Sequence, residues 1–159
     1  MKRAAQLQPL SRQHHLGLNL SRHAKECADE PNAIAEHWLN ITSYINEMQQ
    51  HFQIEDNLMA HALQPHSSSK PEVASILNTL DAQHKSLHAL MAEVQDLPHS
   101  QSNHVTVGQV KELATLLYDH IRFEERELFP IVERYLTTEE LEAIYDASPD
   151  SIKRSDENR

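Results

Sequence analysis

The 159-residue chain contains almost no cysteine and very little glycine. Cys27 is its only cysteine, and it has two glycines. A single cysteine excludes an internal disulfide bond and a thiolate metal site. With so little glycine the chain lacks a glycine-rich phosphate loop, and helix-forming residues dominate, which predicts an all-α fold. A chain of this length is expected to form one domain with a substantial core.

Long hydrophobic runs are also absent. No apolar stretch approaches the ~18 residues that suggest a membrane span. The N-terminus, MKRAAQLQPLSRQ, is basic but has no apolar region of the kind found in signal peptides. The formal net charge of −10 argues against nucleic acid and anionic membranes as partners. We therefore expect a cytoplasmic protein.

Short polar and proline-containing segments divide the chain. DEPN (29–32), QPHSSSKPE (64–72) and LPHSQSNH (97–104) have the composition of loops. Four helical segments remain, at about residues 11–28, 33–63, 72–96 and 105–136. Long helices joined by short loops predict an up-down-up-down antiparallel four-helix bundle.

A short C-terminal fifth helix is expected after the bundle. Thr137 is followed three residues later by Glu140, which is the pattern of a capping box. The bundle and this helix make up a predicted domain of residues 1–147. The charged residues 148–159 are predicted to be a disordered tail. No internal sequence repeat is apparent.

Histidine and glutamate interrupt the apolar stripes of two segments. The second segment carries His51 and Glu55 on its inward stripe, and the fourth carries His120 and Glu124. Each pair is four residues apart, so both side chains leave the same face of a helix. The inward stripe is predicted to continue through Leu58 and Ala62 in one segment and through Leu128 and Ile131 in the other. A buried unpaired carboxylate costs several kcal/mol, so something must compensate for it.

The first and third segments add further histidines. The third has His84 and His88, four residues apart on its apolar stripe. The first has two adjacent histidines, of which His14 shares its face with apolar residues and His15 does not. The periodicity therefore favours His14 as the inward residue, with His15 as the alternative.

These residues fall at similar heights when they are counted from the helix ends at ~1.5 Å per residue. A single histidine on an apolar face is usually a satisfied core residue. Five histidines and two carboxylates in one buried layer would instead be desolvated groups without an opposite charge. A pair of iron ions would turn them into ligands, with the carboxylates as bridges. The predicted metal site is His14, His51, Glu55, His84, His88, His120 and Glu124.

At these residues the sequence resembles the hemerythrin-like, or HHE cation-binding, family, in its bacterial single-domain form. The matching elements are L-S-R-Q-H (10–14), H-F-Q-I-E (51–55), H-K-S-L-H (84–88) and H-I-R-F-E-E (120–125). The resemblance implies two non-haem iron ions with an oxo or hydroxo bridge derived from solvent. It further implies that His14 and His51 hold one iron, that His84, His88 and His120 hold the other, and that Glu55 and Glu124 bridge them.

One position departs from the oxygen-carrying members of that family. They have an aspartate five residues after the last histidine, where this chain has Glu125. The bacterial proteins more often use a glutamate four residues after it, which is Glu124. Because Glu124 also lies on the inward stripe, we expect it to be the bridge and keep Glu125 as the alternative.

The resemblance and the ligand set also suggest a function. A ligand set rich in neutral imidazole suits reversible binding or sensing of O₂ or a related diatomic, and a homodimer is compatible with that role. No nucleophile or catalytic triad is apparent, which favours a binding module over a conventional enzyme. Three alternatives stay open: a di-iron enzyme acting on nitric oxide or peroxide, an iron donor for iron–sulfur cluster repair, and an iron-responsive interaction module.

Overall fold

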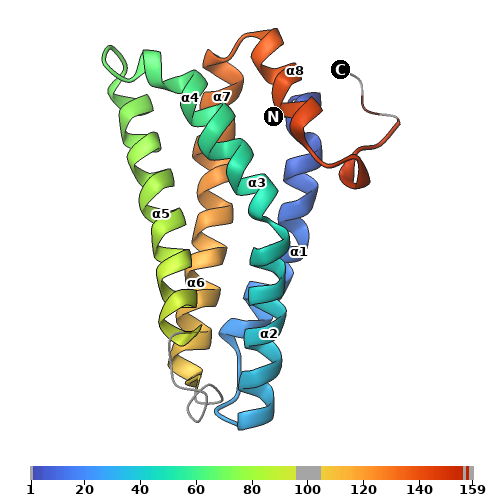
Figure 1. The fold of residues 1–159 in the computed structure, drawn as a ribbon, viewed down its shortest axis with the longest axis vertical. Helices are drawn as coiled ribbons and strands as arrows, with labels where there is room; N and C mark the ends of the chain where they lie inside the picture. Colours follow the sequence, from blue (N-terminus) through green and yellow to red (C-terminus); the bar gives the residue numbers. More distant parts are fainter. Residues whose placement is uncertain (1, 96–104, 156, 158–159) are drawn as a thin grey trace.

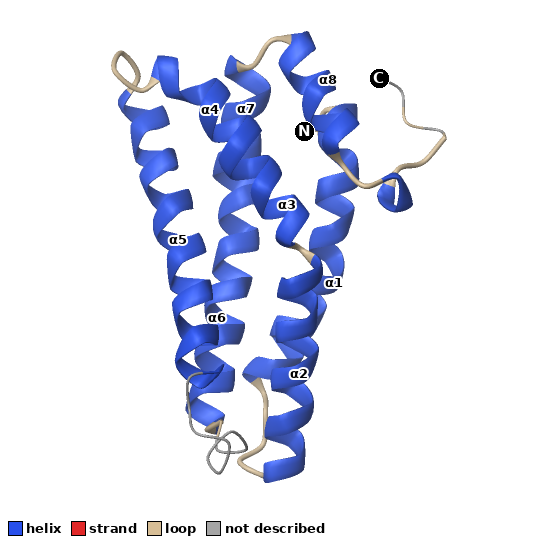
Figure 2. Cartoon of the chain, viewed as in Figure 1, coloured by secondary structure: helices blue, strands red, loops and turns tan. Residues whose placement is uncertain are grey.

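The computed structural model describes residues 2–95, 105–155 and 157, and this part of the chain is all-helical, without a strand (Figure 2). Long helical stretches run side by side along the longest axis of the molecule (Figure 1). The predicted loop 97–104 lies outside the described residues. No described helix is long and apolar enough to cross a membrane.

Four long helices and a series of shorter ones make up this arrangement. A 3₁₀ turn, η1, precedes the first long helix, and a last turn, η6, follows α8. The bounds are η1 Ala5–Leu7, α1 Gln8–Lys25, α2 Pro31–Glu47, α3 Gln49–Ile54, α4 Ala60–Leu63, η3 Gln64–His66, α5 Pro71–Gln95, α6 Val107–Phe123, α7 Phe129–Tyr135, α8 Thr138–Ala147 and η6 Asp150–Ile152. The Thr137–Glu140 capping box is present at the start of α8.

A π-helical turn, η2 (Glu55–Met59), lies between α3 and α4. The sequence pattern does not predict it. A π turn adds one residue to a helical turn, so the inward face beyond it moves by one position. Met59 and Leu63 are fully buried there, whereas the predicted Leu58 and Ala62 are only partly buried.

A second π-helical turn, η5 (Glu124–Leu128), lies between α6 and α7. Leu128 is buried, as predicted. Four residues later it is Val132 that is fully buried, and the predicted Ile131 is only partly buried. In the second stretch the one-residue shift therefore applies only beyond Leu128. Each π turn begins at a predicted bridging glutamate.

The apolar core consists of two clusters on either side of one polar layer. On α5, Leu80 belongs to one cluster and Leu87 to the other, with His84 between them. On α6, Leu117 and Phe123 belong to different clusters in the same way. The histidine layer is therefore enclosed by packed apolar side chains along the helix axes.

Helix α1 approaches α2 and α6 closely at Gly17. A Cβ atom at this position would lie 2.6 Å from Ile121 Cδ1 and 2.6 Å from the Tyr44 hydroxyl oxygen. The Tyr44 hydroxyl donates a hydrogen bond to the main-chain carbonyl of Gln13, at 2.7 Å. Because Gly17 has no side chain, Tyr44 can lie against α1 and form this hydrogen bond next to His14.

The N-terminal segment contacts α7, and the C-terminal segment contacts α1 and α8. The main-chain nitrogen of Ala4 donates to Glu133 at 2.8 Å. Beyond residue 147, Arg12 donates to the carbonyl of Ile152 at 2.6 Å, and the Tyr145 hydroxyl donates to Glu157 at 2.6 Å. The domain boundary at residue 147 stays a prediction.

Candidate metal centre

Four buried histidines come from four different helices: His14 from α1, His51 from α3, His84 from α5 and His120 from α6. Between them lie two glutamates, Glu55 and Glu124, which are the first residues of the two π turns. All six are at most 5% exposed. π turns are frequent at functional sites, because they turn a side chain away from the regular helical phase.

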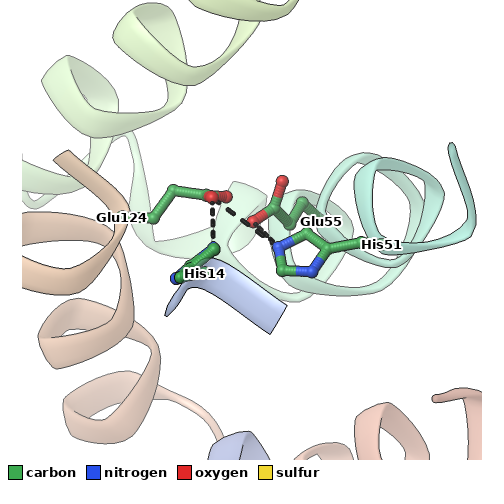
Figure 3. A group of neighbouring side chains, drawn as sticks. All are labelled: His14, His51, Glu55 and Glu124. Atoms are coloured by element: carbon green, nitrogen blue, oxygen red, sulfur yellow. Dashed lines mark hydrogen bonds and ion pairs between the residues drawn. The ribbon is translucent and has the colours of Figure 1, made fainter. Parts of the chain in front are cut away.

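One group of four consists of His14, His51 and the two glutamates (Figure 3). The Nε2 atom of His14 lies 2.8 Å from Glu124 Oε1. The Nε2 atom of His51 lies 3.0 Å from Glu55 Oε2 and 3.6 Å from Glu124 Oε1. One ligand atom from each of these residues falls within 4.8 Å of the others, which is close enough to surround one metal ion.

The second group contains the same two glutamates with His84 and His120. His84 Nε2 lies 3.1 Å from Glu55 Oε1, and His120 Nε2 lies 3.5 Å from Glu124 Oε1. The two oxygens of Glu55 therefore face different groups, one toward His51 and the other toward His84. This is the arrangement that a carboxylate needs in order to bridge two ions.

The opposite ring nitrogen of every one of these histidines faces an oxygen atom outside the group. These contacts run from Nδ1 of His14 to Glu125 (2.7 Å), of His51 to Gln13 (2.9 Å), of His84 to Asp56 (2.9 Å) and of His120 to Gln83 (2.6 Å). Metal-binding histidines characteristically donate their second ring nitrogen to such a partner, which fixes the ring and its tautomer.

The surroundings shift the pKa values in different directions. Burial lowers the pKa of His14, and it lowers that of His120 to about 3. Burial also acts to lower the pKa of His84, but hydrogen bonds to Asp56 and Glu55 outweigh it and raise the pKa to about 9. Burial raises the pKa of Glu55, but the neighbouring imidazoles reverse this, and the net shift is downward.

Two buried polar atoms in this layer have no hydrogen-bond partner. They are His120 Nε2 and Glu124 Oε2. Leaving a buried polar group unpaired costs about 1–3 kcal/mol, and both atoms belong to the same candidate group. A cation bound there would satisfy both. Imidazole nitrogens and carboxylate oxygens are also suitable donors for a transition metal, so the residues present fit a metal pair.

The structure brings six of the seven predicted residues together: His14, His51, Glu55, His84, His120 and Glu124. The seventh, His88, is exposed, and its Nδ1 lies 2.7 Å from the main-chain carbonyl oxygen of His84. It belongs to neither group. Of the two alternatives, His15 is exposed, and Glu125 contacts the outer nitrogen of His14. The assignment of ligands stays a prediction.

Sequence reasoning missed the outer residues Gln13, Asp56 and Gln83. Each of them is next to a predicted ligand in the chain. Neighbouring residues on a helix point about 100° apart, so none of the three lies on the inward stripe that identified the ligands. An amide or acid directly beside a ligand was the available signal.

The outer residues also show a correspondence between the two halves of the chain that the sequence analysis did not recognise. Gln13-His14 corresponds to Gln83-His84, and the segments HFQIED (51–56) and HIRFEE (120–125) share a histidine, a glutamate and a final acid. The histidines of each half are separated by 37 residues (51 − 14) or 36 residues (120 − 84). Each glutamate begins a π turn. At the site the molecule therefore has approximate internal two-fold symmetry.

The all-helical fold, with two histidine groups that share two buried carboxylates, places the chain in the class of helical metal-binding proteins. The chain matches the family described as Hemerythrin HHE cation binding domain over residues 6–132 and belongs to this family. No curated protein and no solved structure matches the chain.

Proposed function

We propose that this protein is a non-haem di-iron protein that binds or senses O₂ or a related diatomic inside an up-down-up-down four-helix bundle, with α8 as the short fifth helix. His14 and His51 would hold one iron, and His84 and His120 the other. Glu55 and Glu124 would bridge them together with a solvent-derived oxo or hydroxo group. His88 is the predicted seventh ligand, but the geometry favours a six-residue site.

The sharing of both carboxylates by two groups carries this proposal. Two carboxylates beside four imidazoles supply two negative charges, too many for a neutral core and suitable for two cations that share them. Each ion would receive two imidazoles and two bridging oxygens, which leaves coordination positions open for a small ligand. When bound, iron would supply the electrons needed for reversible O₂ binding.

The residues around the site exclude water. The ring of Phe129 stacks on His14 with centroids 5.5 Å apart. Phe52 lies 4.7 Å from the His84 ring and 5.8 Å from the His120 ring. With apolar clusters on both sides of the layer, such surroundings suit a small, weakly polar ligand better than a large polar substrate.

Metal analysis and optical spectroscopy test the proposal. Protein produced with iron should contain close to two irons per chain, one for each group. The anaerobically reduced protein should change its visible spectrum on exposure to air and recover it when O₂ is removed. Metal content near zero, or zinc in place of iron, would overturn the assignment. Continuous turnover of peroxide or nitric oxide would indicate the enzymatic alternative.

A further inference from the structure

We propose that Gln13, Asp56, Gln83 and Glu125 form a closed ring of positioning residues around the site, which holds every inner imidazole in the tautomer that a metal requires. We call these four residues the outer ring. The inference rests on the proposed metal site and extends it to residues that would not touch the metal.

The outer ring passes once through all four helical stretches. Gln13 on α1 contacts His51 on α3, and Asp56 on η2 contacts His84 on α5. Gln83, next to that histidine, contacts His120 on α6. Glu125 on η5 then contacts His14 on α1, beside the starting residue. Each stretch thus supplies one histidine and supports the histidine of the next, and the circuit is complete.

The chemistry of the outer ring determines where the histidine protons lie. A carboxylate oxygen or an amide oxygen only accepts a hydrogen bond. Each Nδ1 facing such an oxygen must therefore carry the proton. The other ring nitrogen, Nε2, faces Glu55 or Glu124 in every case. A metal ion binds to Nε2 by displacing any proton there, and while Nδ1 keeps its own proton the Nε2 lone pair is the one that can be donated. With metal bound, all four Nε2 lone pairs would be directed at the positions of the ions.

The two glutamines of the outer ring also border cavities at the surface. Gln13 lines a cavity of about 140 Å³ with Tyr44 and Met48. Gln83 lines one of about 250 Å³ with Asp119 and Arg122. Leucine is one atom shorter than glutamine, so beside these cavities it can replace either amide without being forced into a filled core. This separates loss of the hydrogen bond from overpacking, which makes the glutamines the most informative positions to change.

The test uses Gln13→Leu and Gln83→Leu, which remove the acceptor, and Gln13→Glu and Gln83→Glu, which keep an acceptor oxygen. Gln53→Leu is the matched control, because Gln53 is exposed on the same helix as His51. The first measurement is anaerobic titration with Fe²⁺ against a competing chelator. Loss of an outer partner typically costs 10–100-fold in metal affinity, and we expect this loss for the leucine variants, recovery for the glutamate variants and no change for the control.

The second measurement needs no metal. Imidazole ¹⁵N spectra of the metal-free protein report which ring nitrogen carries the proton. His51 should lose its Nδ1–H form in Gln13→Leu, and His120 should lose it in Gln83→Leu, while thermal unfolding verifies that each variant is folded. If wild-type protein binds no iron but the tautomers change as stated, the outer ring stands and the proposed function fails. If wild-type protein binds iron and the leucine variants keep both affinity and tautomer, or the control weakens equally, the outer ring is overturned.

Discussion

The site has two halves: His14 and His51 form the first, and His84 and His120 form the second. The two halves have the same types of side chain in different surroundings. In the first half, Glu125 supports His14 and is itself held by the hydroxyl of Ser11, at 2.8 Å, with Arg3 3.6 Å away. In the second half, the corresponding acid is Asp56, whose side chain is 51% exposed, against 29% for Glu125. One acid is thus enclosed beside a cation, and the other is open to water.

This difference is reflected in the protonation of the two histidines. Burial lowers the pKa of His14, whereas the hydrogen bonds of His84 to Asp56 and Glu55 raise its pKa to about 9 against the effect of burial. Near pH 7 in the metal-free protein, His14 is then neutral, whereas His84 is protonated on both ring nitrogens and carries a positive charge. A metal ion entering the second half has to displace the proton on Nε2 of His84. The two halves therefore have the same types of ligand, but only the second must lose the His84 proton before it binds a metal ion.

The largest expected effect comes from a residue that both halves share. Glu124→Ala removes a carboxylate that belongs to both groups, so both ions lose a ligand and the charge that neutralises them. We expect metal content per chain to fall close to zero, measured by elemental analysis. His84→Ala should instead lose the metal of the second half.

Glu127→Ala is the matched control, since Glu127 is an exposed acid on the same π turn. It should leave the metal content unchanged. If Glu124→Ala retains both ions while Glu125→Ala loses them, the bridge is Glu125.

The next effect distinguishes how the two halves pack. Gly17 lies three residues after His14, and the corresponding position after His84 is the buried Leu87. A methyl group at Gly17 would meet Ile121 and Tyr44 at 2.6 Å. Gly17→Ala should therefore lower the free energy of unfolding by about 1–3 kcal/mol, as overpacking does, measured by denaturant unfolding.

The chain's other glycine provides the control. A Cβ at Gly108 would meet only Thr106 Oγ1, at the ordinary distance of 3.6 Å. Gly108→Ala should stabilise the protein by about 0.4–1 kcal/mol, because it restricts the unfolded chain. Equal stability changes for the two glycines would contradict the close approach of α1.

A smaller effect concerns pH and the second half alone. The pKa of His84 is raised to about 9 from about 6.5 in an unfolded chain. Its contribution to the stability of the metal-free protein is therefore fully present below about pH 6.5 and is lost as the pH rises through about 9. Thermal unfolding of wild-type protein and His84→Gln between pH 6 and 10 should show a difference that shrinks across this window. A constant difference would mean that His84 is not protonated in the folded state.

Much of the site followed from periodicity, because His51, Glu55, His120 and Glu124 occupy positions that a regular helix turns inward. The all-helical fold followed from composition and spacing in the same way. The inward-facing residues beyond each glutamate could not be predicted in full, because a repeat of three and four residues contains no signal for the extra residue of a π turn. That is why Met59 is buried where Leu58 was expected.

The outer ring could not be predicted for a different reason. Gln13 and Gln83 are ordinary polar residues in the sequence, and only the packing of neighbouring helices shows that their oxygens face His51 and His120. The internal two-fold symmetry was missed because it is confined to a few positions. At Gly17 and Leu87, for example, the two halves differ.

The smallest expected effect concerns His88, the one predicted ligand outside both groups. Its side chain is exposed, and its Nδ1 faces the carbonyl of His84. Binding metal would require this side chain to leave that carbonyl and pass Phe52, whose ring centroid lies 5.9 Å away. We expect His88→Ala to retain close to two metals per chain, with a stability change within about 0.5 kcal/mol, as for other surface positions. His84→Ala, one helical turn away, should lose a metal in the same assay. Loss of one metal from His88→Ala would show that His88 turns inward when metal binds, and the second half would then hold three imidazoles against two in the first.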